Sequence, residues 1–183
     1  MALQRHKRSE EWVQNLETEF LKAHDTYAEP LFRHALIRIR DREAAKDVVQ
    51  ETFSRAWVYL SKGKEVQYMR AFLYRVANNL IVDGARKKKS ASLDTMMEDD
   101  GFEPADESLT DPADVPASRE AMKMLSGLDE IYRTAITMRY MDELSPSEIA
   151  KALGVSENVV SVRIHRGIEK LKAMMDKEPP QKA

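Results

Sequence analysis

The sequence predicts an all-α protein of two small domains, an N-terminal helical bundle and a C-terminal helix-turn-helix, joined by a flexible acidic linker. Three observations lead to this prediction. Charged residues form 33% of the chain, glycine and proline number only 6 and 7, and no recurrent alternation of β-branched residues indicates strands. Several segments repeat apolar residues at helical spacing. A strongly acidic segment, residues 90–116, separates two groups of such helices.

Residues 9–40 are expected to form two helices of the N-terminal bundle. Ser9 can cap the first helix, and Trp12 and Val13 lie on its expected inward face. In the second helix, apolar residues recur at every fourth position. We expect both helices to serve only the core of the bundle.

The next helix, DREAAKDVVQETFSRAWVYL, begins after a capping residue, Asp41, and is strongly amphipathic. Its apolar residues follow helical spacing from Val49 to Leu60. The opposite face is polar, and taken alone it is typical of an ordinary solvated surface. That face carries Asp47, Gln50, Glu51 and Arg55.

The longest predicted helix covers residues 66–89, and its expected exposed side combines aromatic, amide and cationic groups. Such side chains can stack on bases, bond to base edges and neutralise phosphates, as binding of single-stranded nucleic acid requires. The lysine run at the helix end also complements the helix dipole, so a structural interpretation stays open. Gly84 weakens this helix by roughly 1 kcal/mol relative to alanine, which a bend or a close contact would explain. The exposed side carries Tyr74, Arg75, Asn78, Asn79, Arg86, Lys87 and Lys88.

Charge is unevenly distributed along the chain, although the net charge is only −2. Residues 1–89 hold 18 basic and 12 acidic side chains, and residues 117–183 hold 11 and 10. Residues 90–116 hold nine acidic side chains and no basic one. Such a linker can keep two domains apart, or it can imitate nucleic acid within a basic channel of a partner.

A helix-turn-helix is predicted near the C-terminus. Ser145, Pro146 and Glu148 form a capping-box pattern that begins a short helix, and Gly154 can end that helix with a positive φ. Ser156 caps a second helix that carries its own apolar stripe.

The outward face of the second helix suits a DNA groove, because arginine can pair with guanine or phosphate and valine can contact a thymine methyl. An ordinary helical hairpin with solvated arginine and histidine is the alternative interpretation. The face carries Val162, His165 and Arg166, with Arg163 on its flank.

Several classes of function are disfavoured by composition. The chain has no cysteine, and its four scattered histidines make no metal-site spacing, so we expect no metal and no cofactor. No catalytic carboxylate cluster, phosphate-binding loop or nucleophile–base pair is evident, so we expect a protein that is not an enzyme. The sequence has neither a signal peptide nor 18 consecutive apolar residues, and we expect a cytoplasmic protein without stable membrane insertion.

The order of the segments resembles bacterial RNA polymerase sigma factors of the extracytoplasmic-function (ECF) group, small members that keep only the second and fourth conserved regions. The resemblance places a region 2-like domain at residues 9–89, the linker at 90–116 and a region 4-like domain at 117–175. Three motifs carry it: DVVQETFSRAW (47–57), RAFLYRVANNLIVDGARKKK (70–89) and SPSEIAKALGVSENVVSVRIHRGIEKL (145–171).

The resemblance implies a factor that binds core RNA polymerase, directs it to promoter DNA and helps melt that DNA. The polar face from Asp47 to Arg55 resembles the polymerase-docking surface. The face from Tyr74 to Lys88 resembles the surface that recognises and melts the −10 element. Relatives are often held inactive by an anti-sigma factor, which is a further expected partner. The −35 element would be read by Ser161, Val162, Arg163, His165 and Arg166.

This chain also departs from the family pattern. Ser161 stands where many relatives have lysine, so the promoter sequence is not transferable, and Gly84 stands where bulkier residues are frequent. The alternative function is a conventional helix-turn-helix regulator that binds palindromic duplex DNA without recruiting polymerase. A nucleic-acid-processing enzyme is a third class with little support in the sequence.

Overall fold

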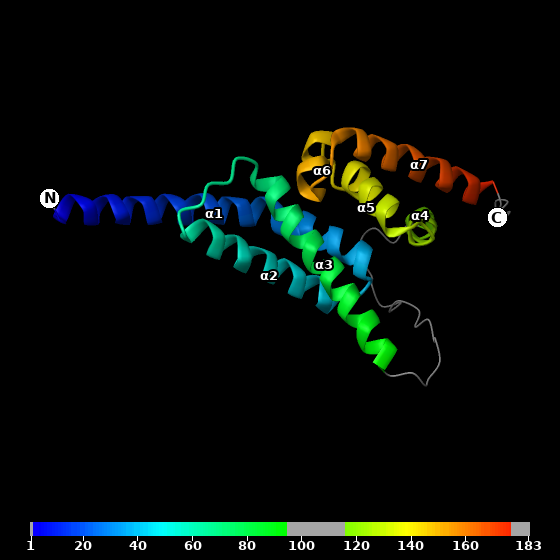
Figure 1. The fold of residues 1–183 in the computed structure, drawn as a ribbon, viewed down its shortest axis with the longest axis horizontal. Helices are drawn as coiled ribbons and strands as arrows, with labels where there is room; N and C mark the ends of the chain where they lie inside the picture. Colours follow the sequence, from blue (N-terminus) through cyan, green and yellow to red (C-terminus); the bar gives the residue numbers. More distant parts are fainter. Residues whose placement is uncertain (1, 95–115, 177–183) are drawn as a thin grey trace.

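The computed structural model describes residues 2–94 and 116–176, with side chains for residues 11–87 and 121–176. Every regular element within those ranges is a helix, which confirms the predicted all-α class. Figure 1 shows α1, α2 and α3 as one group and α4 to α7 as a second group packed beside it. The predicted linker lies, over residues 95–115, outside the described residues.

A single helix, α1 (Ala2–Ile39), replaces the two helices expected over residues 9–40. Pro30 lies inside it, although a proline in a helix interior costs about 3 kcal/mol. The two residues that follow on the inward face, Leu31 and Ala35, are completely buried. Their packing holds the helix together across the proline, so tertiary contacts override the local signal.

The N-terminal half of α1 extends beyond the other helices (Figure 1). Trp12 and Val13 are 46% and 40% exposed, so the expectation that they face the core is wrong. The bundle closes over α1 only further along the helix, where Phe20 makes edge contacts with the rings of Phe53 and Trp57 at 5.9 and 5.1 Å.

Helices α2 (Arg42–Ser61) and α3 (Met69–Asp94) complete the N-terminal bundle. The Asp41 side chain accepts a hydrogen bond from the amide of Ala44 at 3.0 Å, as the predicted cap requires. The predicted apolar stripe of α2 is buried at Phe53 and Leu60. The helix periodicity in the sequence therefore located both faces of α2 correctly.

The C-terminal group forms the predicted helix-turn-helix. The side-chain oxygen of Ser145 accepts from the Glu148 amide at 3.2 Å, while the Glu148 carboxylate accepts from the Ser145 amide at 2.8 Å. Gly154 ends the first helix with φ +67°, and Ser156 caps the second. One turn before the motif is π-helical. The elements are α4 (Pro116–Ser126), α5 (Glu130–Ile136), η1 (Thr137–Met141), α6 (Pro146–Leu153) and α7 (Glu157–Met175).

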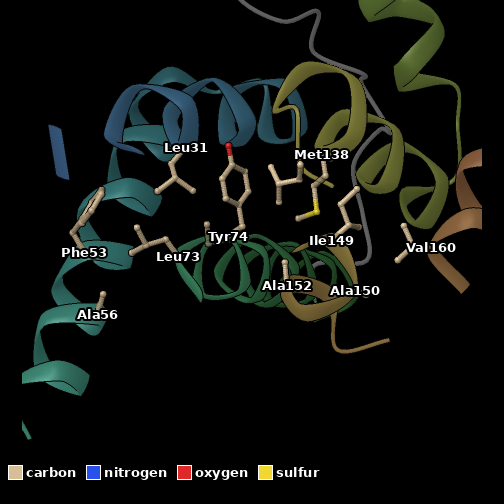
Figure 2. Packing of buried hydrophobic residues seen from close by; sticks show 12 residues of the cluster. Leu31, Phe53, Ala56, Leu73, Tyr74, Met138, Ile149, Ala150, Ala152 and Val160 are labelled. Carbon is tan, nitrogen blue, oxygen red and sulfur yellow. The ribbon is translucent and has the colours of Figure 1, made fainter. Parts of the chain in front are cut away.

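One hydrophobic cluster runs through both groups of helices. Figure 2 shows Tyr74 of α3 between Leu31 of α1 and Met138 of η1, with Ile149 of α6 alongside. Ala150 and Ala152 of α6 are buried members of the same cluster. The two domains are therefore packed on one another in this structure.

Candidate nucleic-acid interface

Helix α7 presents the predicted recognition face to solvent. Val162, His165 and Arg166 are exposed, and Arg163 is half-buried. Ser161 is exposed, and its hydroxyl donates to the carbonyl of Glu157 at 3.0 Å. The opposite face is anchored by Val160, which is completely buried. The sequence thus located the two faces of this helix correctly.

On α3, the structure corrects the expected exposure of Tyr74. Its side chain is completely buried, and its ring lies 5.2 Å from the ring of His34 in an edge arrangement. Burial raises the pKa of the Tyr74 hydroxyl, and the Asp142 carboxylate adds to that effect. The reason for the error is that helical periodicity distinguishes an apolar from a polar face, but it does not show which other elements, here α1 and the C-terminal domain, cover the polar one.

The other predicted residues of α3 divide into two sets. Asn78 is half-buried, and its side-chain oxygen accepts from Nη1 of Arg38 at 2.6 Å. The other described side chains are solvent-exposed and are distributed along the helix. Lys88 lies in α3, but its side chain is outside the described residues. The exposed set is Arg75, Asn79, Arg86 and Lys87.

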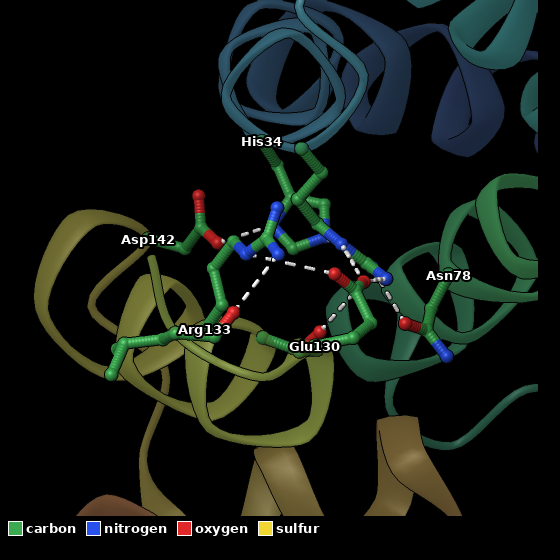
Figure 3. Close-up of polar contacts among 8 residues, drawn as sticks. His34, Asn78, Glu130, Arg133 and Asp142 are labelled. Carbon is green, nitrogen blue, oxygen red and sulfur yellow. Dashed lines mark hydrogen bonds and ion pairs between the residues drawn. The ribbon is translucent and has the colours of Figure 1, made fainter. Parts of the chain in front are cut away.

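A buried polar network joins α1 to the C-terminal domain (Figure 3). Nδ1 of His34 lies 2.7 Å from a carboxylate oxygen of Asp142, and both side chains are at most 4% exposed. The guanidinium of Arg38 lies 3.4 Å from Nε2 of His34 and donates from Nε to Glu130 at 2.9 Å. Because a guanidinium only donates, Nε2 of His34 accepts and Nδ1 donates to Asp142.

The positive charge of Arg38 is buried and paired with Glu130. Its side chain is 1% exposed, and burial lowers the pKa of the guanidinium, while Glu130 opposes that shift. The Glu130 side chain is 47% exposed, so removing it should cost less than about 3–5 kcal/mol, the range typical of a fully buried pair. Glu130 and Asp142 both belong to the C-terminal domain, so these pairs exist only while the domains are packed together.

The polar face of α2 is free of the other domain. Asp47, Gln50, Glu51 and Arg55 are all exposed, and Nε of Arg55 lies 2.6 Å from a carboxylate oxygen of Glu51. In Figure 1, α2 lies on the opposite side of the molecule from α6 and α7. A groove between α1 and α2 adjoins this face and includes Gln50 in its lining.

Sequence reasoning missed two aromatic residues beside the connection between α2 and α3. Tyr59 is partly exposed with Nζ of Lys64 4.9 Å from its ring centre, and Tyr68 is 46% exposed. Exposed tyrosines beside lysines are suited to stacking on unpaired bases. The turn sequence SKGKE with an aromatic residue on each side was the available signal.

The described part of the chain contains no group of three or more His, Asp or Glu side chains that could hold a metal ion. Among the helices in the described ranges, none is long and apolar enough to cross a membrane. The exposed candidate groups are basic and amide side chains on α3 and α7, with the two exposed tyrosines beside the connection between α2 and α3.

Comparison with known proteins links these faces to one family. The family model for Sigma-70 region 2 matches residues 24–91, and the model for Sigma-70 region 4 matches residues 118–171. The chain is also 31% identical over 153 residues to the ECF RNA polymerase sigma factor SigL of Mycobacterium tuberculosis, covering 81% of this chain and 84% of SigL. The chain belongs to the ECF group of RNA polymerase sigma factors.

Two further similarities extend over most of this ECF sigma factor. It is 29% identical over 164 residues to the ECF RNA polymerase sigma factor SigW of Bacillus subtilis, covering 82% of this chain and 86% of SigW. Its fold matches the sigma factor RpoE of Bartonella quintana, solved in complex with the anti-sigma factor NepR, with a TM-score of 0.66. That match covers 91% of this chain and 99% of RpoE at 20% identity, and it supports the fold.

Proposed function

We propose that this ECF sigma factor binds core RNA polymerase, directs it to specific promoters and helps melt the DNA for transcription initiation. The observation that carries this proposal is that region 2 and region 4 of the family both match one chain. Sigma factors in general are not enzymes, and we infer that this protein acts through binding energy alone.

The −35 contact is assigned to α7. A helix-turn-helix places its second helix in the major groove, and the exposed side chains of α7 suit that position. Arg166 and Arg163 can pair with guanine or phosphate, and Val162 can contact a thymine methyl. His165 and Ser161 complete the assigned face.

Capture of the −10 strand is assigned to the face of α3. Unpairing a base costs a few kcal/mol, and stacking on aromatic side chains returns about 1–3 kcal/mol per base. Asn79 and the half-buried Asn78 supply amides for base edges, and Arg75 supplies positive charge. Tyr74 is buried in this structure, so its assigned ring would have to become accessible before a base could stack on it. Arg86, Lys87 and Lys88 extend the positive charge along the helix for phosphate contacts.

Polymerase docking is assigned to the polar face of α2. Its side chains include both signs of charge and are all exposed, and α2 lies away from α6 and α7 in Figure 1. Such a face can bind a complementary surface without interfering with DNA. The assigned residues are Asp47, Gln50, Glu51 and Arg55.

Two further expectations accompany this function. Bartonella quintana RpoE is described in complex with the anti-sigma factor NepR, which supports an anti-sigma factor as a partner of this chain. Transcription takes place in the bacterial cytoplasm, where we expect this protein to act.

Run-off transcription tests the proposal directly. Purified core RNA polymerase is incubated with fragmented genomic DNA of the source organism, with and without this protein, and the RNA 5′ ends are read. New start sites with two shared upstream elements at a constant spacing are expected. Absence of new starts, together with failure to co-purify with core polymerase, would favour the conventional helix-turn-helix regulator.

Variants can separate the two DNA contacts. Replacing Arg75 and Asn78 with alanine should impair promoter opening, measured by permanganate reactivity of unpaired thymines, more than promoter recruitment. Replacing Arg166 should weaken recruitment instead. Normal opening by the Arg75 and Asn78 variant would remove this role from α3.

A further inference from the structure

The N-terminal part of α1 forms a rod that extends beyond the bundle (Figure 1). This N-terminal rod consists of residues 2–19, which at roughly 1.5 Å per residue span about 27 Å. It ends where Phe20 contacts the rings of Phe53 and Trp57 of α2. The region 2 match begins at residue 24, so the rod precedes the part of the chain that matches that region.

An apolar stripe continues from the bundle onto the N-terminal rod. Trp12, Leu16 and Phe20 follow one another at four-residue spacing, and Val13 lies beside them on the same face of the helix. Phe20 packs against the core and Leu16 is half-buried, whereas Trp12 and Val13 are 46% and 40% exposed. An exposed tryptophan that prolongs a buried apolar stripe is a surface suited to cover by another helix.

Charge on the N-terminal rod is divided into two blocks. Residues 2–8 hold three basic side chains and no acidic one, and residues 10–19 hold four acidic side chains and no basic one. The first turn of α1 contains no acidic residue, so the basic block opposes the helix dipole. A helical segment of this length is only marginally stable in water without tertiary contacts. The rod therefore needs a partner that brings acidic groups to its beginning and apolar groups to Trp12.

A second copy of the same rod supplies both. When two rods lie antiparallel, the basic block of each copy faces the acidic block of the other, and the two helix dipoles are opposed. A parallel pair would place like charges side by side. Glu11 and Glu17 of the acidic block are exposed and accessible to a partner. Each copy uses the same surface, so the contact is complete with two chains.

We propose that two copies of this chain associate through their N-terminal rods, packed antiparallel. Trp12 and Val13 of each copy become buried in the contact, and the charge blocks fix the antiparallel direction. Because the contact involves only one short helical segment from each chain, the dimer is weak and forms at high protein concentration. This inference does not depend on the proposed role in transcription.

Sedimentation equilibrium of the full-length chain tests the association. The average mass of the wild type should rise with concentration toward twice the monomer mass. It should fall in high salt, since the screening length decreases from about 10 Å at 0.1 M to about 3 Å at 1 M. Trp12→Ala should raise the dissociation constant about 10- to 100-fold. A wild type that stays monomeric at every concentration, or that grows beyond a dimer, would overturn the two-fold pairing.

A charge swap tests the direction of the pairing. The double variant Glu11→Lys with Glu17→Lys makes the rod largely basic, and Arg5→Glu with Arg8→Glu makes it largely acidic. Each variant alone should be monomeric because the two rods then repel each other. An equimolar mixture of the two variants should restore a dimer, which a merely local structural role of these residues would not do.

A matched control makes the same charge change outside the rod. Glu43→Lys with Glu65→Lys, both at exposed positions, should dimerise as the wild type does. Far-UV circular dichroism of each variant reports whether the bundle is folded. Failure of the folded, mixed variants to form a dimer would overturn the proposal. A monomeric wild type whose co-purification with core polymerase is reduced by Trp12→Ala would also overturn it, and would assign the rod to polymerase.

Discussion

Gly167 is buried where α7 packs against α5, and Gly167→Ala is expected to destabilise the C-terminal domain. A Cβ at this position would lie 2.5 Å from Cδ1 and 3.2 Å from Cγ1 of Ile136, and 3.3 Å from Cβ of Tyr132. Ordinary contacts of this kind are 3.4–4 Å. Ile136 is packed in a cluster with Leu125 and Leu128, which restricts its movement.

The expected change in the free energy of unfolding for Gly167→Ala follows from two opposing effects. Overpacking a well-filled site costs about 1–3 kcal/mol. Alanine is favoured over glycine in a helix interior by about 1 kcal/mol, which offsets part of that cost. We therefore expect Gly167→Ala to lower the free energy of unfolding by about 1 kcal/mol. Gly84 provides a matched control on α3, because a Cβ there meets no atom within 4 Å. Gly84→Ala should stabilise the protein by about 0.5–1 kcal/mol.

Urea denaturation can show which domain each of the two substitutions affects. Both tryptophans, Trp12 and Trp57, lie on the N-terminal bundle, so their emission follows that domain while far-UV circular dichroism follows all helices. Gly167→Ala should lower the midpoint of the circular dichroism transition more than that of the emission transition. Gly84→Ala should raise the emission midpoint. Equal stabilisation by the two substitutions would refute the steric argument at Gly167.

Four further predictions concern the capping box, its pH dependence, the duplex contact and polymerase docking. Ser145→Ala should lower the free energy of unfolding by about 1 kcal/mol, and a wild-type denaturation midpoint would contradict the role of the capping box. Burial alone would raise the pKa of Glu148, but hydrogen bonds from Ser145 lower it overall. Wild type should therefore be more stable than Glu148→Gln at pH values above the ordinary carboxyl pKa. This difference in the free energy of unfolding should disappear as the pH falls through the lowered pKa of Glu148. Arg166→Ala should weaken binding of holoenzyme to a promoter duplex by about 1–3 kcal/mol, measured by gel shift, and unchanged affinity would exclude this contact. Glu51→Lys should reduce co-purification with core polymerase, whereas Glu43→Lys on the same helix should not.

Local structure in the C-terminal motif was predictable because each helix end there is specified by adjacent residues. The Ser145 cap, the positive φ of Gly154 and the Ser156 cap all form as the sequence predicted. The Asp41 cap of α2 was predictable for the same reason. These interactions span only a few residues, so sequence spacing determines them.

Features that depend on distant contacts were not predictable in this way. Residues 9–40 were expected to form two helices, but α1 is continuous over this range, and its residues Leu31 and Ala35 are packed in the core. Tyr74 was expected on an exposed face, but it is buried between α1 and the C-terminal domain, next to Leu31 and Met138. His34 and Asp142 are 108 positions apart, so no periodicity or motif connects them. The prediction of a bend or a close contact at Gly84 was wrong for the contact, because a Cβ there would meet no atom within 4 Å.

The π-helical turn η1 makes the interdomain contact sensitive to the number of residues in one short segment. Its final bond joins the amide of Asp142 to the carbonyl of Thr137 at 3.0 Å, five residues earlier, instead of the usual four. Deleting one residue from η1 would turn the following side chain by about 100° and direct Asp142 away from His34. The Ser145 cap begins α6 independently and would still form the helix-turn-helix. An insertion or deletion at η1 could thus uncouple the two domains of a sigma factor without changing any residue that contacts DNA or polymerase.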